Sequence, residues 1–174
     1  MEVAINDIIT LFILVLPALV SNASPVVIAK LLNGRMHPID FGRYFVDGRR
    51  ILGDGKTWEG LAFGVAVGTL VGAIIGLALG DISYYTLAGL IGSFAALLGD
   101  ILGSFIKRRY GIERGACVPI LDQLDFYTLA VFALWLAGYP VKCSAAVLLG
   151  FFVIIAHVTT NYAAYRLDLK PRPC

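Results

Sequence analysis

Charged residues are scarce in this sequence. They make up 15% of the 174 residues, whereas 59% are hydrophobic, and the mean hydropathy is +0.82. Soluble domains carry about 25% charged residues, and disordered chains carry few apolar ones, so both classes are excluded. The length leaves no room for a soluble domain beside several membrane spans. We therefore expect one membrane-embedded domain over residues 1–174.

Two further absences narrow the possibilities. The three cysteines, Cys117, Cys143 and Cys174, form no Cys-x-x-Cys pair and lie far apart. They therefore indicate neither a zinc site nor a disulfide scaffold. The first apolar segment lacks a basic start and a small-residue cleavage site, and carries Glu2 and Asp7 instead. It is expected to stay in the protein as a helix rather than to be removed as a signal.

Long apolar runs are abundant and predict an all-α integral membrane protein. About 20 apolar residues are needed to cross a bilayer as a helix. Five segments meet that length, which predicts five transmembrane helices. They are residues 5–31, 60–79, 84–106, 124–140 and 144–165.

The distribution of basic residues predicts the orientation. Of the 14 Lys and Arg residues, all except Lys142 fall in alternate connections, 30–59, 107–122 and 166–174. Basic connections stay on the cytoplasmic side of a membrane. The sequence thus predicts a multi-pass protein of the cell membrane with its N-terminus outside, and its C-terminus and functional side in the cytoplasm.

Glycine recurs at every fourth position of the second span, from Gly60 to Gly80. This spacing predicts a smooth helix face that another helix can approach closely. That helix belongs either to the same chain or to a second copy in a homodimer. Both alternatives stay open.

The first span is interrupted by polar residues and a proline. Pro25 removes a backbone donor near the middle of the membrane, and Asn22 can satisfy a freed carbonyl. The pattern predicts a kinked or broken first helix. The interruption either lines a cavity or is a plain proline kink.

The connection before the second span ends in a glycine-rich stretch, Gly53–Gly60. Its amides, together with the start of the following helix, can face an anion, and Lys56 and Thr57 add a cation and a hydroxyl. We expect it to bind phosphate. The alternative is a basic anchor on anionic headgroups. The phosphate-binding candidates are Gly53, Asp54, Gly55, Lys56, Thr57 and Glu59.

Two known motifs do not apply to this connection. A P-loop requires glycine where Arg50 stands and a preceding strand, which is not predicted. Residues 40–42 spell the Asp-Phe-Gly kinase motif, but the rest of the kinase signature is absent. We therefore treat that match as a coincidence.

Polar residues at the end of the third span share one helical face. Asp100, Ser104, Lys107 and Arg108 follow helical spacing, and Arg109 comes next. Asp100 lies on the order of 10 Å inside the basic cluster, where a charge is costly unless it is paired or metal-bound. The three basic residues alone would be cytoplasmic anchors. Beside carboxylates, they are expected to bind phosphate.

Two more carboxylates open the fourth span. Asp122 and Asp125 are three residues apart on one helix face, so they and Asp100 are expected to converge. Carboxylate oxygens suit Mg²⁺, which shares its coordination shell with substrate phosphates. The alternative is that Asp122 and Asp125 only cap their helix. Together these groups predict a membrane-embedded enzyme for a nucleoside triphosphate and an anionic lipid, with no nucleic-acid partner.

Two ordered blocks of this sequence resemble the signature of the CTP:phosphatidate cytidylyltransferase superfamily. The first block is Lys56-Thr57-Trp58-Glu59-Gly60, and the second contains Gly99, Asp100, Ser104, Lys107, Arg108, Pro119, Asp122 and Asp125.

The short five-span chain resembles more narrowly the archaeal CDP-archaeol synthase family. This match includes Asn22, Pro25, residues 38–42 and residues 48–57. Residues 118–121, Val-Pro-Ile-Leu, stand where the bacterial and eukaryotic branch has His-Gly-Gly. That difference argues against an ordinary CDP-diacylglycerol synthase.

The resemblance implies a Mg²⁺-dependent nucleotidyltransferase. It would transfer CMP from CTP to unsaturated archaetidic acid, an isoprenoid glycerophosphate lipid, and release pyrophosphate. Asp100, Asp122 and Asp125 would hold one or two Mg²⁺ ions. Lys56 and Thr57 would hold CTP, and Lys107, Arg108 and Arg109 the lipid phosphate or pyrophosphate. Asp54 and Glu59 would be a further metal ligand and a partner of Lys56, or simple loop charges.

Three rival functions remain at this point. A Mg²⁺ or anion transporter would also need an intramembrane aspartate, but no internal repeat is found. A CTP-dependent isoprenoid-alcohol kinase would transfer the γ-phosphoryl group and release CDP instead of pyrophosphate. A purely structural membrane protein would tolerate alanine at Lys56, Asp100 and Asp122.

Overall fold

The computed structural model describes residues 5–113, 116, 118 and 120–169. Within this part of the chain, it contains five α-helices and, apart from two isolated β-bridges, no strand. The all-helical prediction is confirmed. The helices are α1 (Ile5–Leu31), α2 (Trp58–Leu79), α3 (Ile82–Arg109), α4 (Leu121–Leu136) and α5 (Cys143–Arg166).

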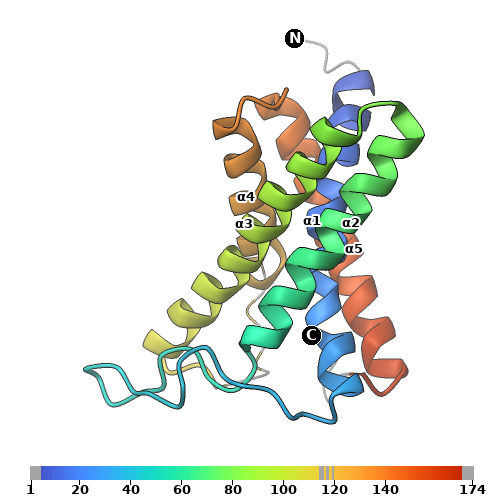
Figure 1. The fold of residues 1–174 in the computed structure, drawn as a ribbon. Coiled ribbons are helices and arrows are strands. Elements are labelled where there is room, and N and C mark those ends of the chain that lie inside the picture. Colours follow the sequence, from blue (N-terminus) through green and yellow to red (C-terminus); the bar gives the residue numbers. More distant parts are fainter. Residues whose placement is uncertain (1–4, 114–115, 117, 119, 170–174) are drawn as a thin grey trace.

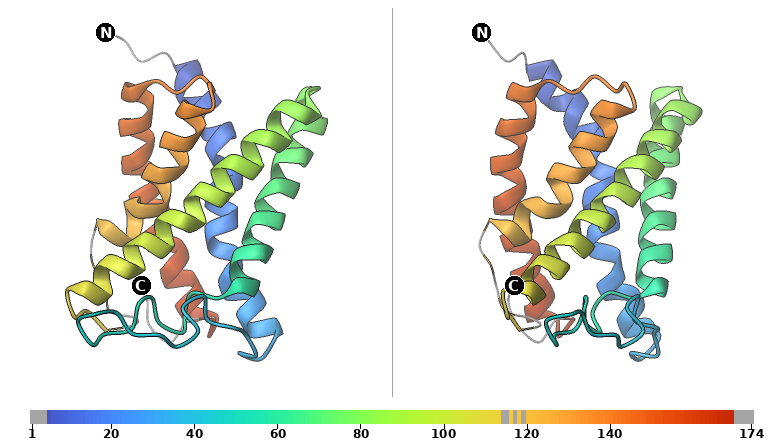
Figure 2. Two further views of the ribbon diagram at one scale, coloured as in Figure 1. Left: turned by 60° about the vertical axis from the view of Figure 1, so that its left-hand side comes forward. Right: turned by 90° about the vertical axis from the view of Figure 1, so that its left-hand side faces the viewer.

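Consecutive helices run in opposite directions, which separates two ends of the molecule. The connection 32–57, the end of α3 and the start of α4 lie together at one end (Figure 1). The start of α1 and the short α2–α3 and α4–α5 turns lie at the other end, as the rotated views also show (Figure 2). We call the first of these the polar end.

Four helices are long and apolar enough to cross a membrane: α1, α2, α3 and α5. The fourth predicted span, 124–140, differs most from the structure, because α4 begins at Leu121 and ends at Leu136. The helix stops because Gly138 adopts a positive φ of 84° and Pro140 cannot continue it. At 1.5 Å per residue, α4 spans about 24 Å, less than the roughly 30 Å hydrocarbon core.

The glycine face of α2 packs inside the chain. Its helical glycines from Gly60 to Gly76 are buried. A Cβ added to Gly64 would lie 3.1 Å from the Ser21 carbonyl oxygen of α1, and one added to Gly72 would lie 2.4 Å from the Tyr85 carbonyl oxygen of α3. The intramolecular alternative is therefore confirmed, and a homodimer stays a prediction.

The helix α1 continues past its two internal prolines, Pro17 and Pro25, without a break. Pro25 has no amide to donate to the Ser21 carbonyl four residues earlier. The Ser24 hydroxyl donates to that carbonyl instead, at 2.7 Å. Ser24 therefore satisfies the freed carbonyl, a role that the sequence suggested for Asn22.

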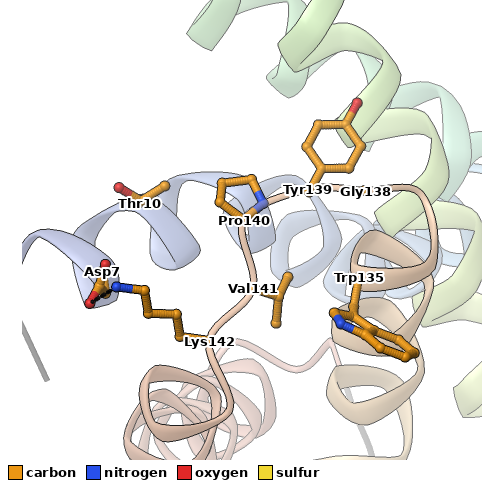
Figure 3. Close-up of a pocket in the computed structure, with 8 residues that line it drawn as sticks. All are labelled: Asp7, Thr10, Trp135, Gly138, Tyr139, Pro140, Val141 and Lys142. Carbon is orange, nitrogen blue, oxygen red and sulfur yellow. Dashed lines mark hydrogen bonds and ion pairs between the residues drawn. The ribbon is translucent and has the colours of Figure 1, made fainter. Parts of the chain in front are cut away.

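Lys142 is the basic residue that the predicted orientation places outside the cell, and it lies at the end opposite the polar end. Lys142 donates to Asp7 at 2.9 Å, beside a hollow of about 620 Å³ that Trp135 and Tyr139 also line (Figure 3). The pair neutralises the Lys142 charge.

Candidate active site

Polar side chains from three segments meet at the polar end. The first segment is the connection 32–57, which covers this end of the helices (Figure 2). The second is the last third of α3, and the third is the first turn of α4. Their charged residues form ion pairs between segments, so the site exists only in the folded chain.

The first ion pair joins Lys56 to Asp100. The Lys56 ammonium donates to Asp100 Oδ2, and their side chains are 21% and 31% exposed. These residues are 44 positions apart in sequence. Lys56 directly precedes Thr57, the N-cap of α2, so the start of this helix aims the lysine at α3. Both charges are compensated, yet both remain accessible to a ligand.

The second ion pair joins α3 to α4. Lys107 donates to Asp122 Oδ1 at 2.7 Å, and each side chain is 17% exposed. The other oxygen of Asp122 accepts the Val118 amide at 2.9 Å. Ser104, one turn before Lys107 in α3, is buried. The predicted helical face of α3 therefore leads from Asp100 to the second pair.

The third aspartate lies directly against the backbone of α3. A Cβ added to Gly103 would lie 2.0 Å from Asp125 Oδ2, and one added to Gly99 would lie 2.4 Å from the Asp125 carbonyl oxygen. Real Cβ atoms do not approach other atoms so closely. The two glycines therefore determine how near α4 brings Asp125 to α3.

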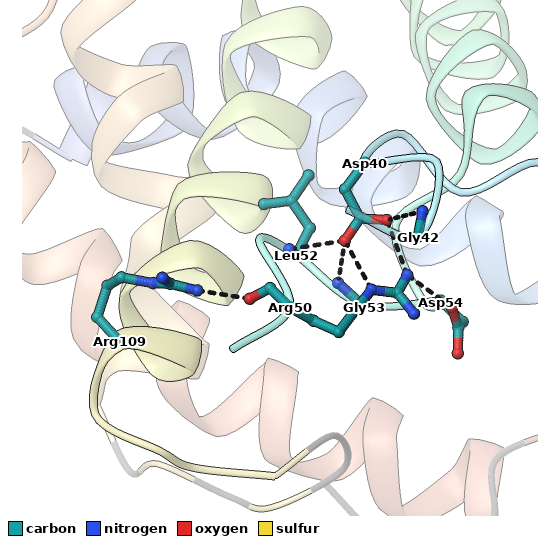
Figure 4. A network of polar contacts seen from close by, with 7 residues as sticks. All are labelled: Asp40, Gly42, Arg50, Leu52, Gly53, Asp54 and Arg109. Carbon is teal, nitrogen blue, oxygen red and sulfur yellow. Dashed lines mark hydrogen bonds and ion pairs between the residues drawn. The ribbon is translucent and has the colours of Figure 1, made fainter. Parts of the chain in front are cut away.

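A buried carboxylate organises the connection 32–57 (Figure 4). The Asp40 side chain is fully buried. Its Oδ2 accepts the amides of Leu52 at 3.0 Å and Gly53 at 2.9 Å, and its Oδ1 accepts Arg50 at 2.8 Å. Arg50 also donates to Asp54 at 2.7 Å. We call these five residues the Asp40 clamp.

The clamp shifts the ionisation of its charged members. Burial alone would raise the pKa of Asp40, but Arg50 and the backbone amides hold this pKa well below its usual value. The pKa of Arg50 is raised above its usual value by hydrogen bonds to Asp40 and Asp54. Asp40 is therefore ionised wherever the protein is folded near neutral pH.

A second arginine ties the connection to the end of α3. Arg109 donates to Asp47 at 2.6 Å and also to the Arg50 carbonyl, and its guanidinium lies 4.6 Å from the Phe45 ring centroid. In return, Arg49 donates to the Arg109 carbonyl at 2.6 Å. Arg109, predicted as a phosphate ligand, thus holds the connection in place in this structure.

Two other predicted residues have structural partners. Thr57 Oγ1 accepts the Gly60 amide at 3.2 Å and so caps α2. Glu59 contacts His37 rather than Lys56. Its Oε1 lies 2.5 Å from the ring Nδ1 of His37, and its Oε2 accepts the His37 amide at 2.9 Å.

The structure divides the predicted site residues into two sets. One set lies in or beside the ion pairs and comprises Lys56, Asp100, Ser104, Lys107, Asp122 and Asp125. The other set stabilises the connection or α2 and comprises Gly53, Asp54, Thr57, Glu59 and Arg109.

The remaining residues singled out from the sequence lie outside both sets. Gly55 is exposed beside Lys56, and Arg108 is half-buried on α3. Pro119, Cys117 and Cys174 lie outside the described residues, whereas Cys143 is a free, exposed thiol.

Three further residues of this end, Asp40, Arg50 and His37, were given no role from the sequence. Only Asp40 carries a usable signal. Aspartate two residues before glycine is typical of an Asx turn, and Asp40 Oδ1 indeed accepts the Gly42 amide at 3.1 Å. The partners of Arg50 and His37 depend on the folded connection, so no local pattern identifies them.

The donor set fits Mg²⁺ in chemistry. Carboxylate oxygens are the ligands that Mg²⁺ prefers. Among the described residues, no three His, Cys, Asp or Glu side chains are close enough together to hold a metal. Asp100 and Asp122 each form an ion pair with a lysine. The metal role of Asp100, Asp122 and Asp125 stays a prediction.

The fold and the site define a class of protein, the multi-pass membrane proteins with an ion-paired site at one end of the helix bundle. Comparison with known proteins is more specific. The profile of the family described as "CarS-like: CDP-archaeol synthase" matches residues 4–173. The chain belongs to the CDP-archaeol synthase family.

Curated relatives are similar over nearly their whole length. The CDP-archaeol synthase of Hyperthermus butylicus is 48% identical, with 91% of this chain and 92% of the relative covered. That of Pyrobaculum calidifontis is 46% identical, with 97% and 99% covered. A solved structure of an intramembrane enzyme for archaeal membrane lipid biosynthesis is similar at a TM-score of 0.80 and 42% identity, covering 88% of this chain and 94% of that chain.

Proposed function

We propose that this protein transfers CMP from CTP to the phosphate of unsaturated archaetidic acid, forming CDP-archaeol and pyrophosphate. A lipid phosphate oxygen forms a bond to the α-phosphorus of CTP, while the bond from that phosphorus to the pyrophosphate oxygen breaks. Such a reaction needs positioned reactants and neutralised phosphate charge rather than a covalent nucleophile. The observation that carries the proposal is the pair of Lys–Asp contacts, Lys56–Asp100 and Lys107–Asp122, at one end of the helices.

The two ion pairs suggest an exchange of partners when substrates bind. In the free protein, each lysine is neutralised by an aspartate. The phosphates of CTP and of the lipid take over the lysines, and the released carboxylates of Asp100 and Asp122, with Asp125, are free to hold Mg²⁺. Bound Mg²⁺ would neutralise charge on the phosphate oxygens and orient them. The exchange leaves no buried charge unpaired in either state, which avoids the main cost of a buried ionic site.

The basic residues divide between the substrates according to their positions. Lys56 lies at the start of α2 beside Gly55, where amides and the helix dipole favour the phosphates of a nucleotide. Lys107 lies between α3 and α4, in the last turn of α3, and with Arg108 serves the lipid phosphate or the departing pyrophosphate. The Asp40 clamp and Arg109 hold the connection that carries Lys56.

This function places the polar end in the cytoplasm, where CTP is made. All five helices then cross the cell membrane as one domain of residues 1–174, with the N-terminus outside and a kink in α1 at Pro25. The connection 137–142 completes the crossing of the short helix α4. The positive-inside rule supports this orientation.

The proposal is tested with purified protein in detergent. The protein is incubated with Mg²⁺, CTP and digeranylgeranylglyceryl phosphate, and CTP labelled at the α-phosphate should yield a labelled CDP-lipid. EDTA should abolish the product and excess Mg²⁺ should restore it. Label at the γ-phosphate should leave as pyrophosphate, whereas a lipid kinase would transfer it to the lipid.

Matched variants connect the reaction to the site. Asp122→Ala and Asp100→Asn should each lower kcat by about 10²- to 10³-fold, as expected for loss of a group that stabilises transition-state charge. Asp81→Asn, at the opposite end of the molecule where Asp81 accepts the Tyr84 amide, should retain most activity. Absence of product from folded wild-type protein would rule out the proposal.

A further inference from the structure

One polar contact at the start of α2 lies outside the two ion pairs. Glu59, in the first turn of this helix, accepts the backbone amide of His37 through Oε2 at 2.9 Å, and its Oε1 lies 2.5 Å from Nδ1 of the same residue. Because an ionised carboxylate only accepts hydrogen bonds, the ring donates from Nδ1. The His37 carbonyl in turn accepts the Trp58 amide at 3.0 Å. The backbone and the side chain of His37 are therefore both bound to the start of α2.

The same pairing continues as far as Lys56. Pro38 and Thr57 form an isolated antiparallel β-bridge, and the next amide, that of Ile39, donates to the Lys56 carbonyl at 2.8 Å. The Lys56 amide donates to the Gly53 carbonyl at 3.3 Å. Both backbone polar groups of Lys56 are thus engaged, so the direction in which its side chain leaves the backbone follows from this pairing.

We propose that Glu59 and His37 are positioning residues for Lys56. Their contacts fix how residues 36–39 lie along residues 56–59, and this alignment directs the Lys56 ammonium toward Asp100. The inference rests on the proposed function, in which the phosphates of CTP take over Lys56. Glu59 and His37 act on that step through the backbone, by keeping the lysine in place before CTP arrives.

The contact between these two residues affects position more than stability. The His37 side chain is 78% exposed and that of Glu59 is 29% exposed, and an ion pair so open to water contributes little to folding. The Asp40 clamp holds the interior of the connection 32–57, whereas Glu59 and His37 join its two ends beside Lys56. Without them, the connection can stay folded while the lysine moves. If Lys56 is in place for about a third to a tenth of the time, the affinity for CTP falls about three- to tenfold.

Three substitutions remove the contacts in steps. His37→Asn keeps a donor where Nδ1 stands, His37→Leu removes that donor, and Glu59→Leu also removes the acceptor of the His37 amide. With saturating digeranylgeranylglyceryl phosphate, the KM for CTP should rise about three- to tenfold in Glu59→Leu and by less in His37→Leu. It should stay near the wild-type value in His37→Asn. The KM for the lipid phosphate should be unchanged in all three variants, and their unfolding midpoints should lie within about 4 °C of wild type.

The reactivity of Lys56 gives a readout that does not depend on the reaction. An ammonium that spends less time on Asp100 is more often accessible to an acylating reagent. In Glu59→Leu, Lys56 should therefore be acylated faster than in wild type, as measured by mass spectrometry of the purified protein. Lys142, at the opposite end of the molecule, is the internal reference and should react at the same rate in both.

The outcomes separate this proposal from the proposed function. A KM for CTP in Glu59→Leu equal to wild type, or the same rise in His37→Asn as in His37→Leu, would overturn the positioning role. Equal rises in the KM for both substrates, with a large fall in the unfolding midpoint, would show a purely structural role and overturn it as well. Failure of wild-type protein to form any CDP-lipid would instead overturn the function, and the acylation of Lys56 would then decide the positioning role by itself.

Discussion

Asp40 shows how one buried carboxylate can organise a whole connection. It accepts two consecutive amides, Leu52 and Gly53, and the guanidinium of Arg50. The Gly53 amide, expected to face a phosphate, is thereby already engaged. The lysine three residues further on, Lys56, is left to reach α3. The clamp therefore positions Lys56, whose amide donates to the Gly53 carbonyl at 3.3 Å.

Replacing Asp40 by asparagine should destabilise the protein and reduce its pH dependence. At pH 7, Asp40→Asn leaves Arg50 without its buried partner, which costs on the order of 3 kcal/mol and roughly 5–10 °C in the unfolding midpoint. A carboxyl whose pKa is depressed by folding stabilises the protein above its unfolded pKa of about 3.9 and loses that contribution as the pH falls toward the folded value. The difference from wild type should therefore shrink below about pH 4. Thermal unfolding across this pH range measures it.

A carboxylate at the other end of the molecule provides the control. Asp81 caps α3 by accepting the Tyr84 amide at 3.0 Å, and asparagine caps helices equally well. Asp81→Asn should unfold within a few degrees of wild type. A midpoint difference for Asp40→Asn that stays constant from pH 7 to pH 3 would contradict the electrostatic account.

At the scale of elements, glycines determine how closely the helices approach one another. The glycine face of α2 lets α1 and α3 approach it, and Gly99 and Gly103 of α3 let α4 approach in turn. The glycines of α2 and those of α3 differ in the groups for which they leave space. The glycines of α2 leave space for backbone and for the Leu97 and Ser93 side chains, whereas Gly103 leaves space for the Asp125 carboxylate itself.

Alanine substitutions in α3 should separate packing from site geometry. In Gly103→Ala, the new Cβ displaces the end of a rotatable side chain, so folding should be retained while activity falls about tenfold or more. In Gly99→Ala, the Cβ meets the α4 backbone and should cost about 1–3 kcal/mol of stability. Unfolding midpoints and kcat distinguish the two effects.

Gly92→Ala is the matched control on the same helix. Its Cβ would lie 3.6 Å from the Leu134 side chain, an ordinary contact. Stability should be unchanged or improved by up to about 1 kcal/mol, since alanine favours helix over glycine. Loss of activity in this variant equal to that of Gly103→Ala would contradict the role given to Asp125.

The whole molecule is asymmetric along its helices. Ion pairs and the connection 32–57 occupy the polar end, and the opposite end carries short turns and the Lys142–Asp7 pair. A chain with this asymmetry inserts in one direction. That direction decides whether the site meets cytoplasmic CTP.

Thiol labelling of intact cells tests the orientation. In a Cys117→Ser, Cys174→Ser background, the exposed Cys143 lies at the end expected outside. A membrane-impermeant maleimide should therefore label it without lysis. A second variant without Cys143 but with Val46→Cys, at a position 93% exposed in the connection 32–57, should be labelled only after lysis. The reverse pattern would show the opposite orientation and remove the site from the cytoplasm.

The sequence alone determined the membrane class, the helical fold and four of the helices to within a few residues, because hydrophobic runs of this length have one solution in a bilayer. Local spacing also predicted that Lys56, Asp100, Lys107, Asp122 and Asp125 would lie together, and the resemblance indicated the family. Only the tertiary structure decided which lysine pairs with which aspartate, that Glu59 contacts His37, and that Asp40 organises the connection. Those partners come from segments far apart in sequence, and their choice depends on how closely the glycine faces let α2, α3 and α4 approach.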